Sequence, residues 1–145
     1  MAKTYRVNAL TRLINLPFSL LGRLGLGANF RHVLTVRGRR SGKPYSTPVD
    51  AIEFEGRRWL VAPYGVTSWV RNVRATGDVE LSRGGQTEHL AVREVAPGEG
   101  APVLRRYLEL VPVTRPYVEV EPDAPTDALE RAISGHPVFE LRAAT

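Results

Sequence analysis

The chain has 145 residues, a net charge of +5 and no cysteine. This length suits one domain with a substantial core and is too short for two independently folded units. The lack of cysteine excludes disulfides, thiolate nucleophiles and cysteine-ligated zinc or iron–sulfur centres. The three histidines, His32, His89 and His136, are far apart and do not have the spacing of a zinc site, so we expect no metal.

Positive charge is concentrated in the first third of the chain. Residues 1–49 contain nine Lys or Arg and no Asp or Glu, whereas the remainder is net acidic. This asymmetry predicts that the first third faces phosphate, nucleic acid or an anionic membrane surface. A basic surface that only keeps the protein solvated is the alternative.

Residues 1–30 form the first expected element, an amphipathic helical segment. Apolar residues from Val7 to Leu24 recur at steps of three and four, and Pro17 predicts a kink or two short helices. The segment either packs on the core or contacts membrane lipid. Because there is no signal-peptide pattern and no apolar run of about 20 residues, we expect a cytoplasmic protein. If the segment contacts lipid, the protein would be peripheral at the inner face of the cell membrane.

Beyond residue 31 the pattern changes to short strands with few helices between them. The expected strands cover residues 32–37, 44–54, 57–62, 79–83, 87–95 and 138–142, and the expected helices cover residues 68–77, 102–111 and 126–134. Five or six mostly antiparallel strands indicate a small barrel and not a doubly wound α/β sheet. We therefore predict a single domain over 1–145, mainly β with flanking helices (α+β), whose barrel core covers 32–145.

The stretch GRRSGKPYSTP, from Gly38 to Pro48, is the clearest chemical motif. Arg39, Arg40 and Lys43 place positive charge on a tight turn, and Ser41 adds a hydroxyl donor, which suits phosphate or carboxylate oxygens. The stretch is not a P-loop, because no hydroxyl follows the lysine, and the chain has no GxGxxG. A basic turn that only protects a sheet edge is the alternative. Proline inside the following strand is tolerated only where the ladder is open or a ligand lies alongside.

Three blocks in order resemble the deazaflavin-dependent nitroreductase family: LTVRGRRSGKPYSTPV, WLVAPYG and SWVRNVRA. The likeness runs from about Val33 to Val95 and more loosely to the closing HPVF segment. Members of this family are split β-barrel proteins, of the type that binds FMN in related families, and they use reduced coenzyme F-420 in actinobacteria. The resemblance implies that this chain is an F-420-dependent oxidoreductase with the same fold.

The resemblance also implies which positions hold the cofactor. The turn would bind the phosphate and acidic tail through Arg39, Arg40, Ser41 and Lys43. The next strand would run beside the deazaflavin ring with Tyr45, Ser46, Thr47, Pro48, Val49 and Asp50. The other edge of the ring would be lined by Ala62, Pro63, Tyr64 and Gly65, and the pocket would be closed by Ser68, Trp69 and Asn72. For Trp69, packing in the core is an equal alternative.

The composition agrees with hydride transfer, because the cofactor carries the hydride and the protein supplies position and electrostatics. We expect a conjugated or quinone-like acceptor, and the amphipathic N-terminus favours an apolar quinone. Tyr64, Tyr107 and Tyr117 are candidate proton donors. We favour Tyr117, on a proline-bounded loop that we expect over the pocket; its alternative role is packing.

Three other functions stay open at this level. The barrel could bind FMN in place of F-420, since composition does not separate two phosphorylated tricyclic rings, or it could be a non-catalytic deazaflavin carrier or sensor. Nucleic-acid binding is the third, but the apolar seam of residues 7–24 and the lack of aromatic residues within GRRSGK argue against it. A homodimer is compatible with the sequence, which does not determine the oligomeric state.

Overall fold

The computed structural model describes residues 30–144, so the expectations for residues 1–29 lie outside the described residues. The strands are β1 (Arg31–Arg37), β2 (Pro44–Asp50), β3 (Ile52–Phe54), β4 (Arg57–Val61), β5 (Asp78–Arg83), β6 (Gln86–Glu94) and β7 (Val138–Ala143). The helices are α2 (Ser68–Thr76), α3 (Pro97–Leu110), the 3-10 turn η1 (Pro112–Thr114), α4 (Arg115–Val118) and α5 (Thr126–Ile133). Within the described part of the chain, no helix is both long and apolar enough to cross a membrane.

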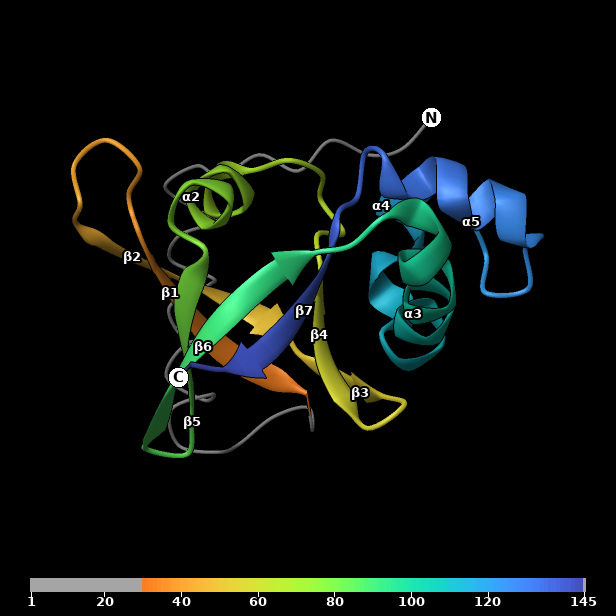
Figure 1. Cartoon of the computed structure of the whole chain (residues 1–145). Helices are drawn as coiled ribbons and strands as arrows, with labels where there is room; N and C mark the ends of the chain where they lie inside the picture. The colour runs from red at the N-terminus through yellow and green to blue at the C-terminus, as the bar shows by residue number, and fades with distance from the viewer. Residues whose placement is uncertain (1–29, 145) are drawn as a thin grey trace.

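All seven strands belong to one antiparallel sheet, in the order β2-β1-β5-β6-β7-β4-β3. The two strands at the ends of this order, β2 and β3, are separated in sequence by Ala51 alone. A sheet whose opposite edges are joined by one residue must curl until those edges meet. The sheet is therefore rolled into a half-closed barrel, which confirms the predicted fold class (Figure 1).

The predicted strand over 44–54 is two strands in the structure. β2 pairs with β1, whereas β3 pairs with β4, and the chain changes partner at Ala51, whose N–H donates to the Phe30 carbonyl. The residue pattern could not show the break, because Val49, Ala51 and Ile52 carry an apolar run through this change, interrupted only by Asp50. Pro48 lies on β2, an edge strand, as proline in a strand requires.

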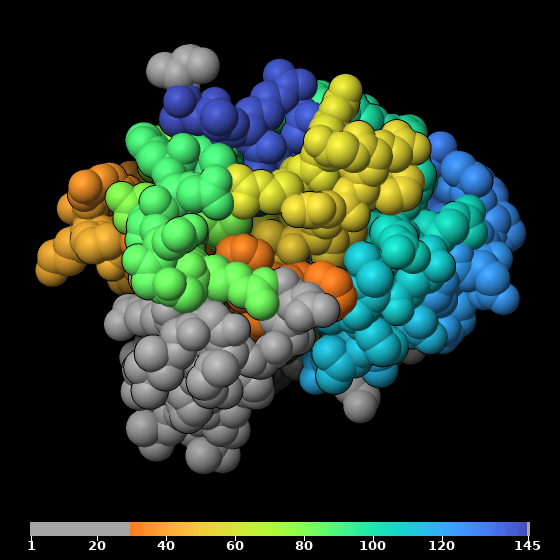
Figure 2. Space-filling model, turned by 90° about the horizontal axis from the view of Figure 1, so that it is seen from below, coloured from red at the N-terminus to blue at the C-terminus, as the bar shows by residue number. Residues whose placement is uncertain are grey.

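The core has two parts on the two sides of the barrel wall. One part fills the barrel under α2 and includes Leu34, Leu60 and Phe139. The other lies between the strands and helices α3 and α5, with Trp59 and Leu104 among its members. Figures 1 and 2 show α3, α4 and α5 grouped on one side of the molecule, while the β1–β2 hairpin projects on the other. Residues of both α2 and the hairpin line a cavity.

The predicted helices are present with shifted bounds. Helix α3 begins at Pro97, five positions before the predicted start, because Pro97 suits the first helical turn; Pro102 lies inside the helix. The predicted proline-rich loop after α3 contains η1 and α4.

Candidate active site

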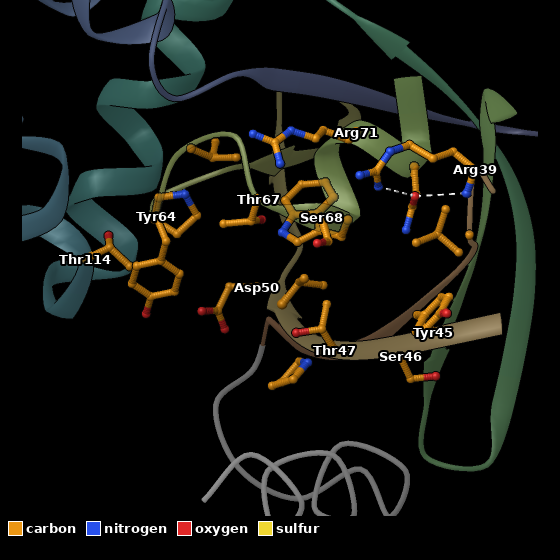
Figure 3. Close-up of a pocket in the computed structure, with 18 of the residues that line it drawn as sticks. Arg39, Tyr45, Ser46, Thr47, Asp50, Tyr64, Thr67, Ser68, Arg71 and Thr114 are labelled. Atoms are coloured by element: carbon orange, nitrogen blue, oxygen red, sulfur yellow. Dashed lines mark hydrogen bonds between the residues drawn. The ribbon is translucent and has the colours of Figure 1, made fainter. Parts of the chain in front are cut away.

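A cavity of about 1130 Å³ lies between the β1–β2 hairpin, α2 and the segment that follows α3. It is lined by Arg31, Val36, Gly38, Arg39, Arg40, Ser41, Tyr45, Ser46, Thr47, Pro48, Val49, Asp50, Val61, Pro63, Tyr64, Thr67, Ser68, Trp69, Arg71, Asn72, Tyr107, Val113 and Thr114. Its two ends differ in chemistry: Arg39 and Ser46 lie at one end, and Asp50, Tyr64 and Thr114 at the other (Figure 3). Such a volume can enclose a ligand of cofactor size.

The turn between β1 and β2 forms the arginine end of the cavity. The Gly38 N–H donates to the Lys43 carbonyl at 2.8 Å, and the Gly42 N–H donates to the Gly38 carbonyl at 2.9 Å. Gly42 has φ +71, which a side chain would strain, so glycine closes this turn. A Cβ on Gly38 would lie 2.7 Å from the Tyr45 ring, so the turn depends on both glycines.

Helix α2 holds this turn from the opposite side. The buried Asn72 Oδ1 accepts a hydrogen bond from the Arg39 backbone N–H at 3.0 Å and another from Arg39 Nη1 at 2.8 Å (Figure 3). Trp69, one turn earlier on α2, lines the cavity and also packs against Phe139, with ring centroids 5.7 Å apart. Trp69 therefore both lines the cavity and packs in the core.

The other end of the cavity contains a partly buried ion pair, in which the carboxylate is the buried member. Asp50 accepts hydrogen bonds from Arg31 Nε at 3.1 Å and from Arg31 Nη2 at 3.3 Å. Burial raises the pKa of Asp50, and the Arg31 guanidinium offsets part of that rise. Burial, followed by the negative charge of Asp50, raises the pKa of the Tyr107 hydroxyl far above its usual range. Tyr107 is therefore a neutral hydroxyl at any physiological pH.

Two features show that the cavity surface suits a partly apolar ligand. Tyr45, Tyr64 and Val113 are the exposed large hydrophobic residues among those described, and all three line this cavity. The Thr67 hydroxyl, at the start of α2, is buried and has no hydrogen-bond partner among residues 30–144. A buried hydroxyl without a partner is unfavourable, and so are large apolar side chains exposed to water. A ligand with a flat ring and polar edges would compensate for both.

Most of the predicted cofactor positions line the cavity, and four predicted positions do not. Lys43 is on the turn but outside the lining, and Ala62 is buried with its carbonyl accepting from His136 Nδ1. Gly65 lies in the loop before α2. Tyr117 packs edge-on against Tyr64, with ring centroids 4.8 Å apart, so it is one ring removed from the cavity.

Sequence reasoning did not single out several residues that line the cavity: Arg31, Val36, Val61, Thr67, Arg71, Val113 and Thr114. Tyr107, a candidate proton donor in the sequence, also lines the cavity. The sequence could have indicated Arg31, because this basic residue directly precedes the first predicted strand in the basic first third of the chain. No sequence pattern indicates Thr114, because it reaches the barrel through the packing of η1.

The family of this chain follows from a comparison with known families. A family model described as F420H(2)-dependent quinone reductase matches residues 20–120. The chain belongs to this family. It is an oxidoreductase that depends on coenzyme F-420, as the resemblance in the sequence implied.

Solved structures with the same fold include members of this kind of reductase. A protein titled as an F420-H2 dependent reductase is 24% identical, with a TM-score of 0.58 over 81% of this chain and 100% of the other. A domain-swapped dimer is 23% identical, with a TM-score of 0.59 over 81% of this chain and 83% of the other. Another F420 reductase is 16% identical, with a TM-score of 0.52 over 85% and 91% of the two chains. At these identities the likeness shows the split-barrel fold alone. No curated protein matches the sequence significantly.

Proposed function

We propose that this chain reduces a quinone-like acceptor with coenzyme F-420 bound in the cavity described above. The observation that supports the proposal is the presence, in one cavity, of an arginine-bearing turn and all the exposed large hydrophobic residues of the described chain. Coenzyme F-420 combines an anionic tail with a flat ring, and the reduced ring supplies the hydride when it is bound. Each part of the cofactor thus has a matching surface.

In this proposal the residues of the cavity bind and orient. Arg39, Arg40 and Ser41 bind the anionic tail. The edge strand β2, from Tyr45 to Asp50, runs beside the ring and has backbone groups with no neighbouring strand on its outer side within the described residues. Trp69 and Tyr64 cover the ring and exclude water.

The acceptor and the proton donor belong to the other end of the cavity. The family name fits a quinone acceptor, and Val113 and Tyr64 offer apolar surface to one. Tyr117 stays our predicted proton donor, although it packs against Tyr64 and does not itself line the cavity, so its hydroxyl would have to move to reach an acceptor. Unchanged quinone turnover in Tyr117→Phe would remove it from this role.

The decisive experiment is a fluorescence titration of the full chain with coenzyme F-420 and, separately, with FMN. We expect binding of F-420, and we expect Arg39→Ala and Arg40→Ala each to raise Kd by about tenfold, because each removes a charge-assisted hydrogen bond. Oxidation of reduced F-420 by a naphthoquinone should accompany binding. Tight FMN binding without a response to F-420 would contradict the proposal.

We also propose that residues 32–145 form the cofactor-binding core of a single domain, and that residues 1–30 bring it to the inner face of the membrane, where apolar quinones dissolve. The amphipathic pattern of residues 7–24 and its arginines support this idea. Sedimentation with vesicles that contain anionic lipid tests it. A protein that stays in the supernatant at low salt does not bind membrane.

A further inference from the structure

Asn72 is a buried polar residue on α2, and its side chain faces the arginine turn. It is 4% exposed. Its Oδ1 accepts two hydrogen bonds, and both come from Arg39: the backbone N–H at 3.0 Å and Nη1 at 2.8 Å. Because the amide oxygen must face these two donors, the orientation of the side chain is determined by the contacts. Asn72 therefore restrains both the backbone and the guanidinium of one residue.

Within residues 30–144, the other hydrogen bonds of the turn are local in sequence. Gly38 bonds to Lys43 and Gly42, and Arg37 Nη1 donates to the Gly42 carbonyl at 3.0 Å. These bonds give the turn its shape but do not attach it to the rest of the molecule. The bonds from Arg39 to Asn72 span 33 positions and attach the turn to α2, on the opposite side of the cavity.

Arg40 offers an internal comparison. It lies next to Arg39, lines the same cavity and is exposed. Among residues 30–144, no hydrogen bond or ion pair restrains its side chain. Two adjacent arginines thus line one end of the cavity, and within residues 30–144 only Arg39 is held by a partner side chain.

We propose that Asn72 is a positioning residue that holds Arg39 in its ligand-binding geometry, and not the direct cofactor contact that the family resemblance implied. An arginine loses rotamer freedom when it binds an anion, and a preformed restraint removes part of that cost. The Asn72 amide is neutral, so it orders the guanidinium without cancelling its charge. This inference rests on the proposed function, because the anion is the tail of coenzyme F-420.

The first test needs no cofactor. In Asn72→Leu, whose side chain is larger but branches at the same position and has no acceptor, the Arg39 amide hydrogen should exchange at least about tenfold faster than in the wild-type protein. Asn72→Asp keeps an acceptor oxygen and should restore most of the protection. Val73→Ala, a core substitution on the same helix, controls for general destabilisation and should leave this amide protected in native conditions.

The second test is a pair of double-mutant cycles, read out as the Kd for coenzyme F-420. We expect Arg39→Ala to raise Kd by about tenfold in the wild-type background and by only about twofold in Asn72→Leu, because the arginine has lost its preset geometry. Arg40→Ala should raise Kd by the same factor in both backgrounds. Val73→Ala should not change the effect of either arginine substitution.

The outcomes separate this inference from the proposed function. If Asn72 acted through direct contact with the cofactor, the Asn72 and Arg39 substitutions would be additive and the inference would be wrong. Unchanged exchange of the Arg39 amide in Asn72→Leu would also overturn it. A wild-type chain that binds no F-420 would overturn the proposed function itself, and the role of Asn72 with it.

Discussion

At the scale of single residues, Arg31 and Asp50 decide the character of one end of the cavity. They are cross-strand partners, because the register of β1 and β2 places Arg31 opposite Asp50. Asp50 is 9% exposed, so its carboxylate has lost most of its water, and among residues 30–144 it is the Arg31 guanidinium that donates hydrogen bonds to it. Burial and the Arg31 charge therefore act in opposite directions on the pKa of Asp50.

We predict that the stability contributed by Asp50 declines as the pH rises. Because its pKa is raised above the usual value of 3.8, folded Asp50 binds a proton more readily than unfolded Asp50. Its contribution is then fully present below pH 3.8 and is lost as the pH rises through the raised pKa. Urea unfolding of the wild-type protein and Asp50→Asn between pH 3.5 and about 7 measures this.

The quantity to compare is the free energy of unfolding of the wild-type protein minus that of Asp50→Asn. We expect this difference to fall with rising pH. A difference that rises with pH would mean that the Arg31 pair outweighs burial, and that the pKa of Asp50 is lowered in the folded protein.

At the scale of elements, a glycine lets α3 pack closely against its neighbours. Gly100 is buried where α3 crosses α5 and β7, and a Cβ there would lie 2.9 Å from Ile133 Cδ1 and 3.3 Å from Val138 Cβ. Glycine is unfavourable inside a helix by about 1 kcal/mol relative to alanine, so its presence here reflects close packing. Since α3 leads into η1, this contact also sets where Val113 and Thr114 reach the cavity.

We predict that Gly100→Ala destabilises the protein by about 1–2 kcal/mol, although alanine is the better helix former. Overpacking costs about 1–3 kcal/mol, and the gain in propensity offsets part of it. Gly98→Ala is the matched control on the same helix, where a Cβ meets no atom within 4 Å. It should stabilise the protein by about 0.5 kcal/mol. Thermal unfolding of both variants checks the signs, and a stable Gly100→Ala protein would contradict the packing argument.

At the scale of the whole molecule, Glu140 joins elements that are distant in sequence. Its buried carboxylate on β7 contacts Arg57 on β4, Arg93 on β6 and Arg142 on its own strand. Arg93 also pairs with Glu99 on α3. Burial raises the pKa of Glu140, but the hydrogen bonds from Arg93 and Arg142 outweigh burial and leave the pKa lowered. The network ties the barrel to the helical side of the molecule.

We predict that Glu140→Gln lowers the free energy of unfolding by about 2 kcal/mol at pH 7, because charge-assisted hydrogen bonds become neutral ones while three half-exposed arginines stay partly solvated. A carboxylate with a lowered pKa contributes stability above its usual value of 4.5 and loses it as the pH falls. The cost of the substitution should therefore shrink below about pH 4. A cost that is independent of pH would show that packing, and not charge, carries the effect.

The sequence alone indicated much of this protein. Alternating apolar residues predicted the strands, because a half-buried strand repeats every two residues, and the GRRSGK turn with the two later blocks indicated the family and its cofactor. Each of these signals is local, carried by a short run of neighbouring residues. The break between β2 and β3, and the helical turns of η1 and α4, were not predicted, because tertiary pairing decides them.

Only the tertiary structure decided how the cavity is assembled. It placed Arg31 against Asp50, brought Thr114 and Val113 to the barrel, and moved Tyr117 behind Tyr64. It also turned Asn72 toward Arg39, across 33 positions of sequence. Such contacts depend on strand register and helix packing, which no local pattern encodes. The sequence by itself thus determined the kind of ligand and the family, and the fold determined which side chains meet around it.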